Sequence, residues 1–451
     1  MLDVLIVGGG PTGLALATQL LGSGVRFRIV DRAPDRVHES RALVIQPRTL
    51  EVLGDLAGPL VAAGNPAVHV HLHSRHRTAD ATLYDVGLDD SPYPFLLFLS
   101  QAETERILAA HLAAGGVPVE RGVEYRDGTL VHGDGRREPV STRYVVGCDG
   151  ARSTVREAAG IPFTGRAYPH TFVLADLEVD GLTPGAAHVF LSARGLLLFF
   201  PLGTPASWRL LAMRQRSDPT PAGAPVELAD LERLVEAYAS VPLGLHEPVW
   251  STNFRLANRG AARYRAGDAF VAGDAAHVHS PAGGQGMNIG IQDAVNLGWK
   301  LRLVCTAIGD SALLDTYDIE RRPVGRAVLR LTDRVFTVGT STNPVMRFAR
   351  ARIVPYVAPL ALRAPVGRGT ANRMLAELSV HYRRSPLSVG RGAGARVPPS
   401  RMDSAAEFRV PGFRLLPDGG LVRPDGYLAY RGDATGLRSY VDRWFPGAPI
   451  G

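Results

Sequence analysis

Apolar runs and amphipathic stretches alternate in the first part of the chain, and this pattern predicts parallel strands connected by helices. Leu2–Val7 is a short apolar run typical of a buried strand, and a helical pattern follows over Pro11–Gly22. Arg26–Val30 predicts a second strand, so these segments form a strand–helix–strand unit with a parallel sheet. Further helices are predicted to begin at Arg48–Leu53 and to run over Ala102–Ala114.

The pattern changes after residue 170, where short apolar runs are separated by Gly and Pro. These runs are Thr171–Leu177, His188–Leu191, Leu196–Leu202 and Trp208–Met213. Their spacing is typical of antiparallel strands. A helix is expected over Leu231–Ala239, and a strand pattern returns at Ala269–Ala272. A glycine-rich loop and a helix from about Asn288 complete this part.

The last third of the chain predicts helices first and irregular structure afterwards. Asp315–Arg334 and Pro344–Ala351 have helical patterns, the second with Asn343 as its N-cap. From Gly390 onward the chain is rich in Gly, Pro and Arg and shows little periodicity. Within this region a Pro-Asp-Gly turn between two apolar runs predicts a hairpin over Leu421–Arg431.

These patterns together predict an α/β protein in four parts. A Rossmann-like α/β domain is expected over residues 1–165 and 255–325, interrupted by an antiparallel β-sheet domain over 166–254 with parts of 60–100. A helical region over 326–390 and a C-terminal tail over 391–451 follow.

Composition and charge narrow the possible partners. The net charge of +7 and pI near 9.6 usually suggest nucleic-acid binding, but every basic residue except Lys300 is arginine and the arginines are scattered. We therefore expect no nucleic-acid partner. No apolar run approaches the roughly 18 residues of a membrane span, and the first strand begins at Leu2, where a leader peptide would lie. A cytoplasmic monomer or homodimer without a membrane partner is the expectation.

Three histidines alternate along one expected strand. His69, His71 and His73 would share a face, which is an arrangement that could hold a metal ion. The simpler interpretation is a polar strand face, with Val70 and Leu72 on the buried side. We favour that interpretation and expect no metal.

The first chemical motif lies between the first strand and the first helix. Gly8, Gly10 and Gly13 fit the pattern G-x-G-x-x-G, which permits a tight turn, close approach of a pyrophosphate and close packing of helix on strand. The helix N-terminus then presents free N–H groups to the phosphates. Asp31 ends the second strand, where an acid can bind ribose hydroxyls, and Arg32 follows it as a further candidate cofactor contact.

Two more segments carry residues that suit a dinucleotide. Val271–His277 ends a strand in Gly-Asp, and it is followed by the glycine-rich loop Pro281–Asn288 before the next helix. Val145–Arg156 contains the reverse pair, Asp-Gly, at Asp149. In this order along the chain, the three motifs resemble the p-hydroxybenzoate hydroxylase-like family of FAD-dependent aromatic monooxygenases.

The resemblance implies a role for each matching residue. Asp274 would lie on the ribityl chain of FAD, and the loop with Pro281, Gly286, Met287 and Asn288 would lie beside the pyrimidine side of the flavin. The remaining implied contacts are Asp149 and Arg156 with FAD and NAD(P)H, Arg41 with the FAD phosphates, and Gln101 with the ribityl chain. Longer relatives carry a thioredoxin-like C-terminal domain, for which the tail over 391–451 is too short. A truncated remnant is the expectation.

The activity implied by the resemblance is hydroxylation of an aromatic substrate through a flavin C4a-hydroperoxide. FAD would be the cofactor, NADPH or NADH the transient reductant and O2 the co-substrate. Baeyer–Villiger insertion and epoxidation on the same fold remain alternatives, and a non-catalytic flavin-binding module is a further one.

The inserted sheet is expected to cover the substrate. Candidate wall residues are Tyr93, Phe95, Phe190, Leu198, Phe200 and Pro281. Strand alternation leaves open which face of the sheet each side chain occupies. No base that deprotonates a phenol stands out, and His188, Arg209 and Arg214 are expected to be structural. The apolar wall favours a large, polyketide-like polycyclic substrate over a small benzoate.

Overall fold

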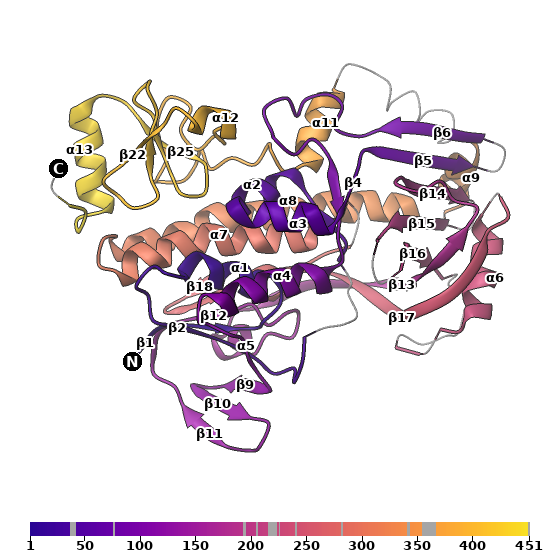
Figure 1. The fold of residues 1–451 in the computed structure, drawn as a ribbon, viewed down its shortest axis with the longest axis horizontal. Coiled ribbons are helices and arrows are strands. Elements are labelled where there is room, and N and C mark those ends of the chain that lie inside the picture. Colours follow the sequence, from indigo (N-terminus) through magenta and orange to yellow (C-terminus); the bar gives the residue numbers. More distant parts are fainter. Residues whose placement is uncertain are drawn as a thin grey trace.

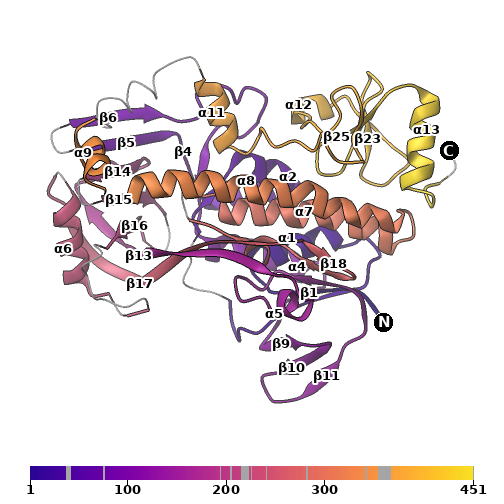
Figure 2. The ribbon, with the colours of Figure 1, turned by 180° about the vertical axis from the view of Figure 1, so that it is seen from behind.

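The computed structural model describes residues 1–36, 42–74, 77–192, 195–203, 206–214, 223–224, 226–239, 241–280, 283–340, 343–353 and 367–449. Arg41 and Pro281, two of the expected site residues, lie outside these ranges. In Figures 1 and 2 a mixed α/β body carries one large sheet at one end and a small C-terminal unit at the other.

A six-stranded, mostly parallel sheet forms the centre of the first part. Its order is β18-β19-β12-β1-β2-β8, and β1 pairs in parallel with both β12 and β2. Val4, Leu5 and Ile6 of β1 are fully buried, as expected for a parallel strand covered on both faces. The strands are β1 (Leu2–Val7), β2 (Phe27–Asp31), β8 (Glu120–Arg121), β12 (Thr142–Gly147), β18 (Arg265–Ala266) and β19 (Ala269–Val271).

Helices pack on this sheet, and two small sheets adjoin it. The helices are α1 (Pro11–Leu20), α2 (Pro47–Leu53), α3 (Ala57–Ala63), α4 (Gln101–Ala114), α5 (Thr154–Ala158) and α7 (Gly286–Cys305). The small sheets are β3 (Val44–Ile45), β7 (Leu96–Phe98) and β4 (Asn65–Ala67), and β9 (Val123–Arg126), β10 (Thr129–His132) and β11 (Arg137–Pro139). The predicted strand–helix–strand unit is confirmed, with shifts of one or two residues at its ends.

An eight-stranded sheet forms the second large layer. Its order is β20-β17-β13-β16-β15-β14-β5-β6, so strands from before residue 100 complete the sheet that begins at residue 163. β14 pairs with β5 in parallel, whereas all the other strand pairs of this sheet are antiparallel. The strands are β5 (His69–Ser74), β6 (Arg77–Thr82), β13 (Phe163–Asp180), β14 (Ala187–Ser192), β15 (Gly195–Pro201), β16 (Trp208–Met213), β17 (Gly244–Ala261) and β20 (His277–Val278).

The two faces of this sheet have different neighbours. Phe190 is 1% exposed and packs in the cluster beneath α6 (Leu228–Tyr238). Leu198 and Phe200 pack on the opposite face with Phe172 and other side chains. The three expected wall residues therefore do not share a face, and the placement of Phe190 in a common wall is wrong, because strand alternation turns it toward α6.

The alternating histidines are not simply a polar strand face. His73 is 9% exposed and stacks on Phe190 at 4.3 Å, whereas Val70 and Leu72 are only half-buried. His73 Nε2 lies 2.9 Å from His188 Nδ1, and His188 Nε2 lies 3.0 Å from the Thr183 carbonyl. Since that carbonyl can only accept, His188 carries its proton on Nε2, and His73 donates to His188. Burial lowers the pKa of both rings, and in their neutral forms His188 accepts at Nδ1 the proton that His73 carries on Nε2.

This pair makes the protein sensitive to acid. Burial lowers the pKa of His73 from 6.5 to about 4, so the unfolded chain binds more protons than the folded chain between these values. The free energy of unfolding is expected to fall as the pH drops from 6.5 toward 4, by at most about 1.4 kcal/mol per pH unit for this group. Urea unfolding of wild type and His73→Leu at pH 7 and pH 5 measures the effect. The variant should show a shallower pH dependence, and exposed His246→Gln an unchanged one.

Long helices connect the two layers with the C-terminal unit. α7 is almost entirely buried and packs against α1 and α8 (Asp315–Thr340). α9 (Pro344–Arg352) and α11 (Arg368–Leu375) follow. The Asn343 cap is confirmed, since its Oδ1 accepts from Val345 N at 2.9 Å.

The C-terminal tail is more ordered than its sequence suggests. Five short strands in the order β21-β25-β24-β23-β22 form a sheet, and the predicted hairpin is its β24–β25 pair. Phe413 lies edge-on to Trp299 of α7 at 5.6 Å, so this unit shares the main core. Its elements are β21 (Val389–Gly390), α12 (Pro399–Met402), β22 (Ala406–Glu407), β23 (Arg414–Leu415), β24 (Leu421–Val422), β25 (Leu428–Arg431) and α13 (Ala434–Trp444).

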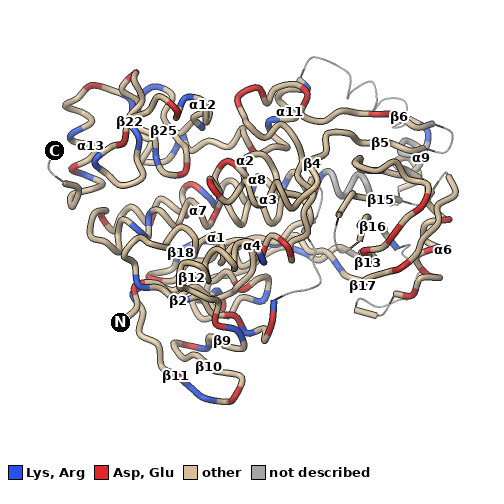
Figure 3. The backbone as a smooth tube through the Cα atoms, in the orientation of Figure 1, with Lys and Arg blue, Asp and Glu red and all other residues tan. Residues whose placement is uncertain are grey.

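Three general properties complete the picture of the described chain. Arginines are interspersed with carboxylates from one end of the molecule to the other (Figure 3). Within the described ranges, no helix combines the length and apolar character needed to cross a bilayer. The same ranges contain no group of three His, Cys, Asp or Glu side chains arranged to hold a metal ion.

Candidate active site

The Gly8–Gly13 turn forms a cradle that tolerates no side chain at two of its glycines. Gly8 has φ +111°, and a Cβ there would lie 2.3 Å from the Cys148 carbonyl oxygen. A Cβ on Gly13 would lie 1.9 Å from the Gly8 carbonyl oxygen. Gly10 caps the N-terminus of α1, and only Glu105 would come within 4 Å of a Cβ placed on it. The turn therefore brings bare backbone and a helix N-terminus to one place, as a diphosphate requires.

Asp31 lies directly beside this turn. Its Oδ2 accepts from Gly9 N at 2.6 Å, and its Oδ1 accepts from Ala33 N at 2.8 Å. Arg121 Nη1 lies 3.6 Å from Asp31 Oδ2, because β8 pairs with β2 at this register. Arg32 is exposed. Asp31, the acid expected to hold a ribose, thus lies at the C-terminal end of β2. The Arg121 guanidinium lies beside it, a neighbour that the sequence alone does not reveal.

The second glycine motif folds against the first. A Cβ on Gly273 would lie 2.4 Å from Thr12 Oγ1, and one on Gly290 would lie 2.5 Å from the same atom. Thr12 of α1 is therefore enclosed between the Gly-Asp turn and α7. Asp274 is exposed while Ala275 and Ala276 beside it are buried, so its carboxylate reaches the surface at the junction of the two motifs.

The Asp149 segment joins the same junction. Asp149 Oδ2 accepts from Thr154 N at 2.7 Å at the start of α5, where Ser153 is the N-cap. Its Oδ1 is buried and has no hydrogen-bond partner among the described residues. Arg156 is 4% exposed and donates to the carbonyls of Ala275 and Ala151 at 3.0 and 2.9 Å. Arg156 therefore connects α5 to the Gly-Asp turn, and a side chain this buried offers little surface to NAD(P)H.

The N-terminus of α7 points toward this junction from the other side. α7 begins at Gly286, two residues earlier than expected. Asn288 is fully buried: its Oδ1 accepts from Gln46 N at 2.8 Å, and its Nδ2 donates to Val44 O at 2.8 Å. Met287 belongs to the core. These residues can therefore face a flavin only through the first-turn N–H groups, which have no acceptor within the helix.

Gln101 lies at the start of α4 as expected. Its Nε2 donates to Glu105 Oε1 at 2.8 Å, and its Oε1 accepts from Ala42 N at 3.3 Å. Glu105 is 2% exposed and lies next to Gly10. Helix periodicity places Glu105 one turn after Gln101 but does not show what its carboxyl group faces, so its sequence position alone assigns it no role.

The large sheet meets this region through a buried ion pair. Arg209 Nε and Nη2 donate to Asp176 at 2.6 and 2.7 Å, and Trp250 Nε1 donates to the same carboxylate at 2.7 Å. Arg209 Nη1 also donates to the Ala42 carbonyl at 3.1 Å, just before β3. Because Arg209 is the register partner of Phe200, the face that carries Leu198 and Phe200 is the one that contacts Ala42, to which Gln101 is also bonded.

Aromatic contacts connect this face of the sheet to neighbouring segments. Phe200 stacks on Phe98 of β7 at 5.7 Å, which connects the sheet to the segment after residue 90. Tyr93 and Phe95 make an edge contact at 6.2 Å, and both pack against the main core. The other side chains considered as bases have internal partners, since Arg214 Nε donates to Asn253 and His188 belongs to the histidine pair.

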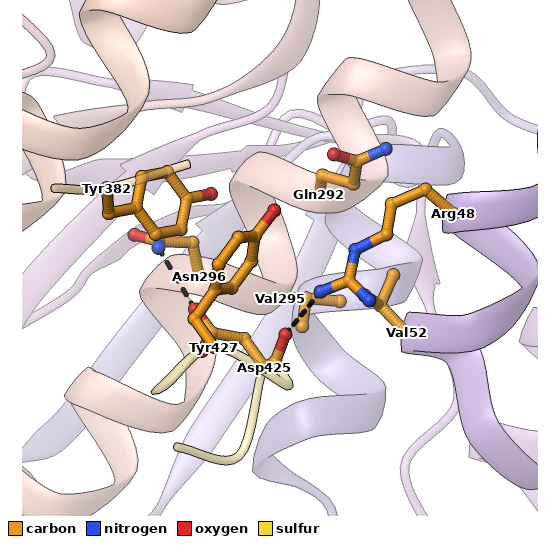
Figure 4. Close-up of a pocket in the computed structure, with 8 residues that line it drawn as sticks. All are labelled: Arg48, Val52, Gln292, Val295, Asn296, Tyr382, Asp425 and Tyr427. Carbon is orange, nitrogen blue, oxygen red and sulfur yellow. Dashed lines mark hydrogen bonds between the residues drawn. The ribbon is translucent and has the colours of Figure 1, made fainter. Parts of the chain in front are cut away.

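A small cavity lies elsewhere, between α2, α7 and the C-terminal unit. Figure 4 shows Arg48 and Asn296 pointing at Asp425, whose carbonyl accepts from Arg48 at 2.5 Å and whose Oδ2 accepts from Asn296 at 3.2 Å. The volume of this cavity, about 10 Å³, is enough for roughly one water molecule. An aromatic ring does not fit, so this cavity belongs to the polar junction that holds the C-terminal unit.

The residues of the main site suit FAD. The two bare glycine turns, an acid at the end of β2, an exposed acid at the Gly-Asp turn and a helix N-terminus lie together. A side chain at Gly8, Gly13, Gly273 or Gly290 would force these packed segments apart. Fold and site define a flavoprotein with one Rossmann-like nucleotide-binding layer. Residues 1–332 match the family described as FAD binding domain, and the chain belongs to that family.

Similar proteins are monooxygenases. The chain is 39% identical to 6-methylpretetramide 4-monooxygenase of Streptomyces rimosus over 441 residues, which cover 92% of this chain and 76% of that protein. It is 31% identical to rifampicin monooxygenase of Streptomyces venezuelae, with 100% of both covered. The solved structure of OxyS anhydrotetracycline hydroxylase from Streptomyces rimosus covers 99% of each chain with a TM-score of 0.76 and 27% identity. The resemblance to p-hydroxybenzoate hydroxylase-like monooxygenases is confirmed, and the chain is an FAD-dependent monooxygenase that uses O2 and an NAD(P)H-type reductant.

Proposed function

We propose that this enzyme hydroxylates a polycyclic, polyketide-like aromatic compound in the biosynthesis of an antibiotic. The observation that carries the proposal is the apolar sheet face with Leu198 and Phe200, which Arg209 joins to the cofactor region. The names of the relatives point the same way, since they act on 6-methylpretetramide and anhydrotetracycline.

The residues divide the work between holding the cofactor and enclosing the substrate. We propose that the Gly8–Gly13 turn holds the FAD diphosphate, Asp31 the ribose and Asp274 the ribityl chain. The first-turn N–H groups of α7 would stabilise negative charge on the pyrimidine edge. Bound FAD supplies the redox chemistry, which moves a hydride from NAD(P)H and one oxygen atom from O2. Leu198 and Phe200 would exclude water from the substrate, so that reducing equivalents are not lost as hydrogen peroxide.

The test measures which compounds stimulate NAD(P)H oxidation by the FAD-loaded enzyme. Polycyclic aromatic compounds are expected to stimulate it and to gain one oxygen atom by mass spectrometry, with the ring skeleton intact. Phe200→Ala should lower kcat/KM about tenfold, equivalent to about 1.4 kcal/mol, and release more hydrogen peroxide. Phe190→Leu on the opposite face is the matched control and should leave the coupling unchanged. Stimulation by small hydroxybenzoates alone would refute the substrate class, and a lactone product would replace hydroxylation by Baeyer–Villiger insertion.

A further inference from the structure

A nearly buried carboxyl group adjoins the glycine turn and forms no ion pair with the described residues. Glu105 is 2% exposed, and its Oε1 lies 3.9 Å from the position of a Cβ on Gly10, the N-cap of α1. The described residues provide Glu105 with one hydrogen bond, the 2.8 Å contact from Gln101 Nε2 to Oε1, and with no ion pair.

The surroundings disfavour a negative charge at this position. Gln101 donates to Oε1, and Arg121, which lies beside the glycine turn, pairs with Asp31 at 3.6 Å. Burial is the largest effect on Glu105 and, together with the carboxylate of Asp31, raises its pKa from 4.5 to about 7, against the lowering effects of Gln101, Arg121 and Arg36. Glu105 is therefore partly protonated at neutral pH before any ligand binds.

A diphosphate at the glycine turn would increase this preference. The turn presents Gly10 and the N-terminus of α1 to a phosphate, and the carboxyl of Glu105 lies against the same glycine. An ionised carboxylate next to a phosphate is repelled, whereas a neutral carboxylic acid can donate a hydrogen bond to it. Negative charge on the ligand would thus keep the proton on Glu105.

We propose that Glu105 binds FAD as a neutral carboxylic acid and donates its proton to an oxygen of the diphosphate. This inference rests on the assignment of the Gly8–Gly13 turn to the diphosphate. It adds a cofactor-binding residue from α4 to the glycine turn, and it couples FAD binding to the uptake of one proton. FAD affinity is then highest below neutral pH and decreases above it.

The test is the dissociation constant of FAD between pH 6 and pH 9, measured with the apoprotein by quenching of flavin fluorescence. For wild type the dissociation constant should be flat near pH 6 and should rise above pH 7, by at most about tenfold per pH unit, the limit for one linked proton. Glu105→Gln keeps a neutral donor of the same shape, so its dissociation constant should stay flat. At pH 9 the variant should bind FAD more tightly than wild type.

A matched control and the opposite outcomes separate this proposal from others. Glu103→Gln removes a carboxylate from the same helix that faces outward and pairs with Arg106, and it should reproduce the wild-type pH profile. Among the described residues, Asp31, Arg36 and Arg121 are the charged side chains that act on Glu105, and Glu105→Gln keeps all three. An equal pH dependence in wild type and Glu105→Gln would overturn this inference alone. A wild-type chain that binds no FAD at pH 6 would overturn the diphosphate assignment as well.

Discussion

Replacing Gly13 with alanine is expected to abolish retention of FAD and to lower the free energy of unfolding by about 2–4 kcal/mol. The added Cβ would lie 1.9 Å from the carbonyl oxygen of Gly8 and 3.4 Å from Cys148 Cβ. The first neighbour is backbone, so no side-chain rotation relieves the clash. α1 must move away from the end of β1, and its N–H groups then no longer converge on the diphosphate. Flavin absorbance of the purified protein and urea unfolding measure the two effects.

Gly58→Ala is the matched control for this substitution. Gly58 is exposed in α3, and a Cβ there has no neighbour within 4 Å. Alanine is the better helix former, so this variant should be unchanged or stabilised by up to about 1 kcal/mol, with full FAD content. A Gly13→Ala protein that is purified yellow and unfolds like wild type would show that the turn is not the cradle described above.

Replacing Glu320 with alanine is expected to produce the largest loss of stability, about 3–5 kcal/mol. Glu320 is almost fully buried in α8 and accepts from Lys300 at 2.8 Å and from Arg423 at 2.6 and 2.9 Å. Although burial alone raises the pKa of Glu320, Arg423 and Lys300 hold it below its usual value. Without this carboxylate two buried cations face each other with only Asp425 to balance them. Urea unfolding and limited proteolysis between residues 377 and 449 measure the loss, because Arg423 belongs to the C-terminal unit.

The control for Glu320→Ala is an exposed cluster of charges in the C-terminal unit, to which Arg423 also belongs. Asp418 pairs with Arg401 at 2.6 Å and with Arg431 at 3.0 Å, and its side chain is 45% exposed. Asp418→Ala should change the free energy of unfolding by less than about 1 kcal/mol, because water already solvates these charges. If Glu320→Ala were equally mild, the buried network would not be what fastens the C-terminal unit to α7 and α8.

Local motifs made the nucleotide-binding layer predictable. A glycine that must approach a carbonyl, such as Gly13, and an acid at the end of a strand, such as Asp31, are fixed by their own short segments. The convergence of Gly8, Gly273 and Asp149 followed from the family resemblance, and the contact of Thr12 with Gly273 places the first two motifs together.

Features that depend on long-range pairing were not predictable. Arg121 reaches Asp31 only because β8 pairs with β2 at one register. The proposed role of Glu105 depends on its distance to Gly10, which the sequence does not show. Strand alternation does not show which face of the sheet α6 covers. His73 was therefore expected on a polar face and Phe190 in the substrate wall, whereas both are buried on the α6 side. The C-terminal sheet escaped notice because most of its strands have two residues, too few to show a period.

The order of strands in the two sheets has a consequence for synthesis of the protein. The mostly parallel sheet takes β1 from the first residues and β19 from Ala269–Val271, whereas the eight-stranded sheet uses residues 69–82 together with 163–261 and β20 at His277–Val278. Neither sheet can close before the ribosome has added about residue 271, and neither can be cut out as one contiguous fragment. FAD can therefore bind only late in translation, and truncated proteins that end before α7 should be purified without flavin colour.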